Sequence, residues 1–322
     1  MRSAVAGSVD LQTEIRDARS RIDHRLDRLM LSDPGQRDLV KVAMREAVLL
    51  PGKRLRPLMT VLAARDLGFD GPAAVDAGCA LELVHTASLL LDDLPCMDDA
   101  TLRRGEQTIH LRYGEDVAVL ASIGLLTQAY GLLAVAPMLT DVQRTQLVQI
   151  LSDAVGVNGL VGGQYTDLRG ADRRPNPADV VVTNDRKTGA LFIAATEFAC
   201  LVADAGEEAR THLRNFAREL GRAFQIMDDM VDADGDEIAA GKDVRQDHGK
   251  VTMLSLLGRD AARRRLSGHV AGSLAALAAL PGGPGRMAFL VRQTFGEAVE
   301  ARRRAMGHHG TEAETSFAAS AE

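Results

Sequence analysis

The chain has 322 residues, of which 46% are hydrophobic and 3% aromatic, and its formal net charge at pH 7 is −6. The length allows one large domain or two, and the acidic balance argues against a nucleic acid as the main partner. The three cysteines, Cys79, Cys96 and Cys200, lie far apart and lack CxxC spacing. Free thiols in a reducing cytoplasm are therefore expected, with no disulfide framework or zinc site; Cys96 is expected to be a packing residue.

The first three helices are predicted from apolar periodicity and from capping residues. An apolar stripe through residues 9–30 predicts a helix, and residues 1–8 before it are expected to be disordered. Ser32-Asp33-Pro34 predicts the start of a second helix that runs to about Leu50, because proline is favoured at the first helical position. A third helix is predicted over residues 55–68.

Basic residues stand at the entrance of this third helix, just after Pro51-Gly52. Lys53, Arg54 and Arg56 could belong to an ordinary basic loop. They could also form an anion site, in which the backbone N–H groups of the helix start add to the side chains.

The next predicted helix begins at Gly71-Pro72, is apolar nearly all round and is therefore expected at the centre of the fold. It ends in a run of acidic residues, which Pro95 interrupts because the residue before a proline avoids the helical conformation. Asp92 and Asp93 then lie on the last helical turn, and Asp98 and Asp99 fold back from the loop.

Carboxylates held so close repel one another, so a cation is expected between them. Oxygen ligands of this kind suit Mg²⁺, which proteins often bind with one or two carboxylates plus substrate phosphates. The neighbouring Arg103 and Arg104 are suited to phosphate oxygens. The alternative is a solvated acidic helix end followed by a basic loop.

The stretch from Val117 to Leu139 runs for 23 residues without a charge, which is long enough to span a bilayer. A central helix that is buried on all sides gives the same pattern. We favour the buried helix, and no stable membrane insertion, because nothing else in the chain resembles a membrane protein.

The middle of the chain continues with two predicted helices. Thr140 to Gln143 reads as a capping box that opens a helix to about Asp167, with Gly162-Gly163-Gln164 near its end. Asn176-Pro177 starts the helix that carries Lys187 and Thr188. Gly189 inside a helix costs ~1 kcal/mol relative to Ala, which indicates a helix break at a functional site.

A second acidic helix is predicted over residues 207–232. Asp228 and Asp232 are four residues apart and share one face, with Asp229 between them. Two acidic helix ends could face each other across a cavity and hold several Mg²⁺ ions; two unrelated charged surface clusters are the alternative. Residues 233–249 are predicted as a loop, followed by helices over 250–280 and 286–306 and a small, polar tail.

Six sequence blocks together resemble a known family. The acidic runs match its DDxxxxD and DDxxD motifs, and the other blocks are Gly52 to Pro57, Arg103-Arg104-Gly105, Lys187-Thr188-Gly189 and Gly241-Lys242-Asp243 through Lys250. Over about residues 40–260 the chain resembles the trans-isoprenyl diphosphate synthases of the polyprenyl synthetase family, in particular bacterial geranylgeranyl diphosphate synthases of carotenoid pathways. The resemblance implies an all-α, single-domain helical bundle of the isoprenoid synthase type around a central cavity, and a homodimer. The composition of residues 308–322 predicts a disordered end, and the free cysteines predict a cytoplasmic location.

The resemblance also implies the substrates and the site residues. The enzyme would join isopentenyl diphosphate to dimethylallyl, geranyl or farnesyl diphosphate, with three Mg²⁺ ions per site. The metal ligands would be Asp92, Asp98, Asp228 and Asp232. Isopentenyl diphosphate would be held by Lys53, Arg56, His85 and Arg104. The other catalytic or substrate-binding residues would be Asp93, Arg103, Lys187, Thr188, Gln225, Asp229, Lys242 and Lys250.

The product length is predicted from the residues before Asp92. Ala87 and Ser88, one turn deeper in the helix, are small and leave room for a growing tail, whereas family members that stop at fifteen carbons commonly place an aromatic residue at the first of these positions. Val84 and Leu81 are bulkier and could form the floor. The C20 product, geranylgeranyl diphosphate, is therefore expected; the alternatives are a C15 or a longer product.

Two other protein classes share parts of this pattern. A class I terpene cyclase would usually line its pocket with aromatic residues, but the chain has no Trp. An inactive regulatory subunit would not need two intact acidic motifs.

Overall fold

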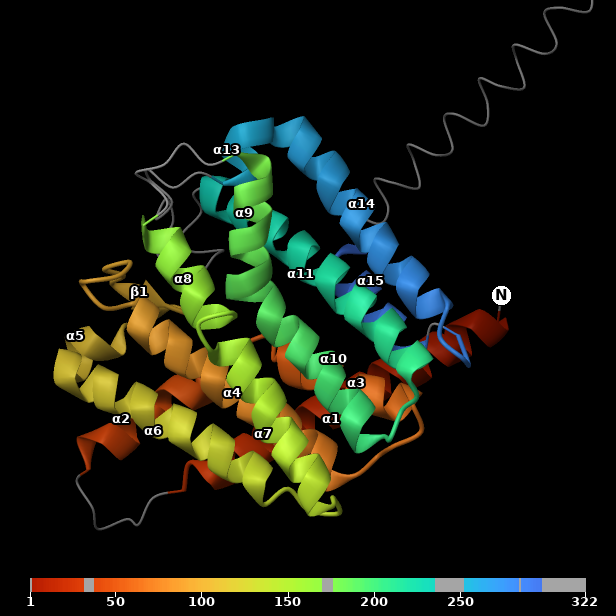
Figure 1. The fold of residues 1–322 in the computed structure, drawn as a ribbon, viewed down its shortest axis with the longest axis horizontal. Coiled ribbons are helices and arrows are strands. Elements are labelled where there is room, and N and C mark those ends of the chain that lie inside the picture. The colour runs from red at the N-terminus through yellow and green to blue at the C-terminus, as the bar shows by residue number, and fades with distance from the viewer. Residues whose placement is uncertain (1, 32–37, 170–175, 235–251, 284, 297–322) are drawn as a thin grey trace, which may run out of the picture.

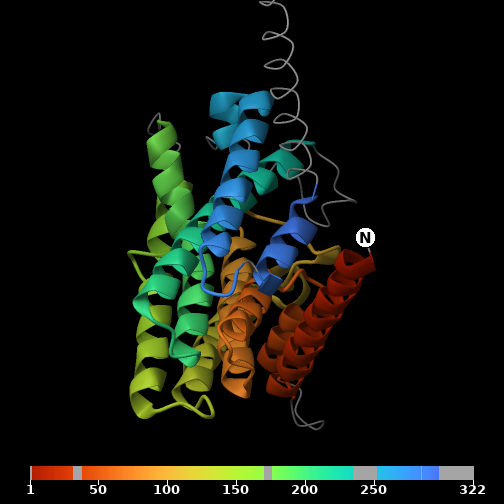
Figure 2. The ribbon, with the colours of Figure 1, turned by 90° about the vertical axis from the view of Figure 1, so that its right-hand side faces the viewer.

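The computed structural model describes residues 2–31, 38–169, 176–234, 252–283 and 285–296, and most of these residues are helical (Figures 1 and 2). Two short antiparallel strands form a hairpin after α4. The elements in chain order are α1 (Arg2–Leu29), α2 (Leu39–Leu49), α3 (Leu55–Asp66), α4 (Pro72–Asp92), β1 (Leu102–Arg103), β2 (Glu106–Gln107), α5 (Ile109–Tyr113), α6 (Glu115–Ala134), α7 (Asp141–Val155), α8 (Leu160–Arg169), α9 (Pro177–Asn184), the π-helical turn η2 (Asp185–Gly189), α10 (Ala190–Val202), α11 (Glu207–Asp234), α13 (Met253–Leu257), α14 (Arg259–Ala278) and α15 (Gly285–Thr294). The predicted all-α class is confirmed.

Helix α4 lies at the centre of the bundle. It packs against α3, α6 and α10, and every residue from Ala73 to Ala87 except His85 is buried. Its glycine, Gly78, allows a close approach to α3, because a Cβ at this position would lie 3.0 Å from the Cα of Pro57. The helix that carries the first acidic motif is therefore fixed by packing along most of its length.

Helix α6 is less buried than the sequence analysis expected. Both α4 and α6 are long and apolar enough to cross a membrane, but 78% of the relevant window of α4 is buried inside the protein, against 44% for α6. Helix α6 packs on α4, and its residues Ala121 and Leu125 are buried, whereas Leu120 and Ile123 are exposed. The expectation that this helix is buried on all sides is wrong, since one apolar face remains uncovered.

Several predicted boundaries also differ. Helix α1 begins at Arg2 and not near residue 9 as predicted; alanines in this stretch favour a helix. Helix α2 begins at Leu39, where the Asp38 carboxylate accepts a hydrogen bond from the Val40 N–H, while Ser32-Asp33-Pro34 lies outside the described residues.

The later helices are more divided than predicted. The capping box at Thr140 is confirmed, but the helix it opens ends at Val155, and the glycine-containing segment 156–159 separates it from α8. Gly258, with φ +77°, separates α13 from α14, where one helix was predicted. Lys187-Thr188-Gly189 lies in η2, a π-helical turn that continues from α9 into α10, so the helix is irregular here but does not break as predicted. Such π-helical turns are frequent at functional sites. Residues 235–251 and 297–322 are not described.

The close contact at Gly78 gives a stability prediction. Gly78→Val should lower the free energy of unfolding by about 1–3 kcal/mol, because the added methyl groups overpack the α3–α4 contact. The matched control is Gly131→Ala in α6, where no atom lies within 4 Å of the new Cβ and helix propensity alone should keep or raise stability. Urea unfolding followed by circular dichroism measures both variants, and an unchanged Gly78→Val midpoint would contradict the packing described.

Candidate active site

A cavity of about 610 Å³ opens at the C-terminal end of α4 and is the candidate site. Its walls come from the start of α3, from α4 and the following hairpin, and from α8, α9, η2 and α11. Segments that are far apart in the sequence thus meet around one space.

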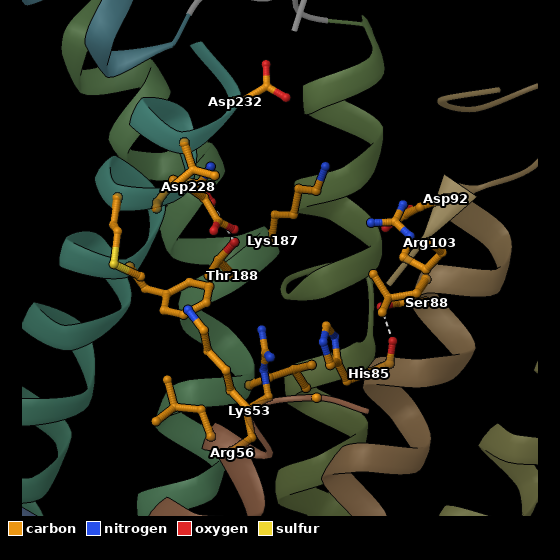
Figure 3. A pocket seen from close by; sticks show the side chains of 18 of the residues that line it. Lys53, Arg56, His85, Ser88, Asp92, Arg103, Lys187, Thr188, Asp228 and Asp232 are labelled. Carbon is orange, nitrogen blue, oxygen red and sulfur yellow. Dashed lines mark hydrogen bonds between the residues drawn. The ribbon is translucent and has the colours of Figure 1, made fainter. Parts of the chain in front are cut away.

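Two groups of aspartates line opposite sides of this cavity. Asp92 extends from the end of α4, whereas Asp228 and Asp232 extend from α11, with Lys187 between the two sides (Figure 3). Asp98 and Asp229 also line the cavity. The sequence-based prediction that the two acidic helix ends face each other is confirmed.

The loop after α4 returns Asp98 to the cavity. The helix ends at Asp92, and the Asp98 N–H donates to the Asp92 carbonyl at 2.9 Å. Pro95 and Cys96 lie at the exposed tip between them, so the interpretation of Cys96 as a packing residue is wrong.

The ionised form of the carboxylates at the end of α4 is unfavourable unless a cation lies beside them. Burial is the main cause that raises the pKa of Asp92 to about 6; the charges of Asp98 and Asp93 act in the same direction, and those of Lys187 and Arg103 oppose the rise. The oxygen-only ligand set fits Mg²⁺. Within the described ranges no three acidic, histidine or cysteine side chains form a complete metal cluster. Magnesium in proteins often takes its remaining ligands from waters and substrate phosphates.

Asp93 points to a different neighbour from Asp92. It is buried and does not line the cavity; its carboxylate pairs with Arg103, whose Nε donates to Asp93 Oδ1 at 2.9 Å. Burial raises the pKa of Asp93, and the Arg103 guanidinium opposes that rise. Asp93 was predicted to be a catalytic residue. In the structure its carboxylate binds Arg103, and Arg103 is the residue that lines the cavity.

A group of basic residues lines the opposite end of the cavity from Asp232. Lys53, Arg56 and His85 lie together there (Figure 3), and Arg104 completes the group. Burial lowers the pKa of Arg56 to about 10. Burial, together with the nearby guanidinium groups, also lowers the pKa of His85 well below its usual range, so that the imidazole is neutral. The positive charges of Lys53, Arg56 and Arg104 would be stabilised by an anion such as a diphosphate.

Arg54 holds the loop that carries Lys53 and Arg56 through hydrogen bonds, a role that was not predicted from the sequence. It has a left-handed conformation, with φ 50°, and donates to Glu82 Oε1 at 2.7 Å, to Asp23 Oδ1 at 3.0 Å and to two carbonyls at the end of α2. Both Arg54 and Glu82 are buried. The bonds fix the loop that presents Lys53 and Arg56; the only sequence signal was the position of Arg54 inside the Gly52–Pro57 block.

Two phenylalanines lie beside the same cations. The Arg56 guanidinium carbon is 5.0 Å from the Phe192 ring centre, and Lys53 Nζ is 6.0 Å from that of Phe224. The two rings are 5.5 Å apart. Aromatic faces attract cations at these distances, so the rings partly compensate the buried positive charge.

The π-helical turn η2 contributes polar groups between the two acidic walls. Lys187 Nζ donates to Asp167 Oδ2 at 2.6 Å, and Thr188 Oγ1 donates to Gln225 Oε1 at 2.8 Å. All four of these residues line the cavity. Lys242 and Lys250 lie outside the described residues, so their predicted roles remain untested.

The residues predicted to set product length lie below the cavity. Ser88 lines it, but Ala87, Val84 and Leu81 are fully buried and do not. The carbonyl of Ala87 accepts a hydrogen bond from Ser122 Oγ at 2.9 Å, so α6 covers α4 at this level. The assignment of these residues to the tail path remains a prediction.

The fold and site define a recognised class of protein. Residues 37–270 match the sequence pattern of the Polyprenyl synthetase family, and the chain belongs to this family.

Two bacterial relatives are especially informative. The chain is 48% identical over 253 residues to a geranylgeranyl diphosphate synthase of Pantoea ananas, which covers 77% of this chain and 82% of the relative. It is 46% identical over 272 residues to a protein of the same name from Pseudescherichia vulneris, covering 84% and 87%. A solved geranyltransferase from Helicobacter pylori, complexed with magnesium and isoprenyl diphosphate, matches with a TM-score of 0.77 and 28% identity over 91% of this chain and 97% of its own.

Because Asp92 and Asp93 have different neighbours, replacing them should affect stability to different extents. Asp93→Ala should lower the free energy of unfolding by roughly 1–3 kcal/mol, because it leaves the mostly buried Arg103 without its carboxylate. Asp92→Ala removes a carboxylate whose pKa is already raised to about 6, so it should destabilise less. Thermal unfolding without added metal compares the two, and an equal or reversed order would contradict the assignment of Asp93 to Arg103.

Proposed function

We propose that this protein is a magnesium-dependent prenyltransferase that condenses isopentenyl diphosphate head-to-tail with allylic diphosphates and releases mainly geranylgeranyl diphosphate. The observation that carries the proposal is the presence of two anion subsites in one cavity. One is lined by opposing aspartates suited to metal ions, and the other by basic residues that need no metal. A reaction that joins two diphosphate esters requires both.

The acidic subsite would receive the allylic diphosphate. Asp92 and Asp98 on one wall, with Asp228 and Asp232 on the other, would hold Mg²⁺, and we propose three ions per site. The metal ions, when bound, would act as Lewis acids on the departing diphosphate. Arg103 and Lys187, which line the same space, would add fixed positive charge where negative charge develops as the carbon–oxygen bond breaks.

The basic subsite would hold isopentenyl diphosphate. Lys53, Arg56 and Arg104 would bind its phosphates, with His85 donating or accepting a hydrogen bond as a neutral imidazole. The double bond of this substrate would attack the allylic cation, and the proton then lost would pass to the departing diphosphate. The oxygens of Thr188 and Gln225 line the space between the subsites and could stabilise the cation.

The C20 product is supported by the two relatives named geranylgeranyl diphosphate synthase and by the small side chains of Ala87 and Ser88. A C15 or longer product is the alternative. A terpene cyclase would not need the basic subsite for a second diphosphate, and an inactive subunit would not need both acidic walls.

The exposed apolar face of α6 supports a homodimer. Leu120 and Ile123 are more than half exposed although the opposite face is in the core. We propose that a second copy of the chain covers this face. A cytoplasmic location without membrane insertion is also proposed, and the free thiols of Cys79, Cys96 and Cys200 are consistent with it.

An assay with radiolabelled isopentenyl diphosphate and each allylic diphosphate tests the function directly. Elongated prenyl diphosphates should form with Mg²⁺ and cease to form with a chelator. Cyclic hydrocarbons made from an allylic diphosphate alone would identify a cyclase, and no turnover in any combination would identify an inactive subunit.

The division between subsites predicts a selective kinetic effect. Arg56→Ala should raise the KM for isopentenyl diphosphate by about 10- to 100-fold, the usual cost of a lost charged hydrogen bond, and change the KM for the allylic substrate much less. Steady-state kinetics with each substrate varied in turn measures both constants. Equal effects on the two KM values would refute this division.

The proposed tail path predicts a change of product. Ala87→Phe places an aromatic ring one turn below Asp92 and should shift the main product from C20 to C15. Val84→Ala and Leu81→Ala should instead permit longer chains. Chromatography of the dephosphorylated products distinguishes these outcomes, and an unchanged C20 product from Ala87→Phe would place the tail elsewhere.

A further inference from the structure

Helix α8 contains a Gly162-Gly163-Gln164 motif to which the proposed mechanism assigns no role. Gln164 lies 72 residues from Asp92 in the sequence, yet its Nε2 donates to Asp92 Oδ1 at 2.6 Å. The side chain is partly buried, and α8 makes contact with η2 and α9. A glutamine from the neighbouring wall thus bonds the carboxylate at the end of α4.

The type of donor matters at this position. A carboxylate can only accept hydrogen bonds, so the amide N–H₂ fixes the orientation of Asp92 through one oxygen. An arginine or lysine here would neutralise the carboxylate and compete with a metal ion, and a glutamate would repel it. A neutral amide holds Asp92 in place and leaves its negative charge available.

Gly163 allows α8 to approach η2 closely, and this approach brings Gln164 within hydrogen-bonding distance of Asp92. A Cβ at this position would lie 2.7 Å from the Cα of Lys187, so the backbone of α8 packs directly on the backbone of η2. One turn further along α8, Asp167 pairs with Lys187. Residues 163–167 therefore position both Asp92 and Lys187 from a single helix.

We propose that Gln164 is a positioning residue for the metal site: it orients Asp92 so that the second carboxylate oxygen can bind a divalent cation, and Gly163 sets the approach of α8 that makes this possible. The inference rests on the proposed function, since it assigns Asp92 to a metal. Residues that orient metal ligands typically change metal affinity by 10- to 100-fold when they are replaced.

The test measures metal binding and not only turnover. Gln164→Met keeps the length of the side chain but removes the donor, and Gln164→Asn keeps the amide but shortens its reach. Both should weaken Mn²⁺ binding in the presence of inorganic pyrophosphate by about 10- to 100-fold in calorimetric or electron paramagnetic resonance titrations. Raised Mg²⁺ should restore most of the kcat.

Thr166→Val is the matched control on the same helix, because Thr166 is exposed and its hydroxyl donates only to the Gly162 carbonyl within α8. It should leave Mn²⁺ affinity unchanged. Circular dichroism and thermal unfolding establish which Gln164 variants are folded, and the more conservative Gln164→Asn provides the comparison if Gln164→Met does not fold.

The outcomes separate this inference from the proposed function. Unchanged Mn²⁺ affinity in a folded Gln164 variant would overturn the inference, even if the unaltered protein makes prenyl diphosphates. Weakened Mn²⁺ binding in a protein that joins no prenyl diphosphates would support the positioning role of Gln164 and overturn the proposed function. A loss of thermal stability without a change in metal affinity would reduce Gln164 to a structural role and also overturn the inference.

Discussion

Like charges are held close together at two places in one cavity, and the chemistry of the site depends on this confinement. The pKa of Asp92 is raised to about 6 and that of Arg56 is lowered to about 10, in each case mainly by burial. Each group is stabilised by the opposite charge, one by cations and the other by an anion. Helix α4 fixes their spacing, because His85 and Asp92 are two turns apart, which is about 10 Å along the axis. In the proposed function, this spacing would hold two diphosphate groups apart while their hydrocarbon parts meet.

The second acidic wall is joined to the first through the π-helical turn η2. Arg222 on α11 donates to both oxygens of Asp185 in this turn, at 2.9 and 2.7 Å. Thr188 bonds Gln225, which in turn donates to Asp229 at 3.0 Å. The irregular turn contacts both α8, which lies beside the first acidic wall, and α11, which carries the second. Local irregularity of this kind is concentrated where the site is built.

Sequence patterns predicted the charged groups of the site better than the contacts that orient them. Periodicity placed Asp228 and Asp232 on one helix face, and Pro95 explained the return of Asp98, because both arguments depend only on local geometry. The pattern could not distinguish Asp92 from Asp93: neighbouring residues point in different directions, and the tertiary partner, here Arg103, decides which one faces the cavity. Hydrophobicity likewise predicted α6 as a helix but not its exposed face, since an apolar pattern does not distinguish a residue buried in the core from one left exposed.

The most direct test of the central claim is a crystal structure with Mn²⁺ and inorganic pyrophosphate, with the metal ions located by their anomalous scattering. We expect metal ions ligated by Asp92 or Asp98 on one side and by Asp228 or Asp232 on the other, with the pyrophosphate between them. Metal bound to one acidic wall alone, or pyrophosphate held only by the basic residues around Arg56, would contradict a shared metal site between the two acidic walls.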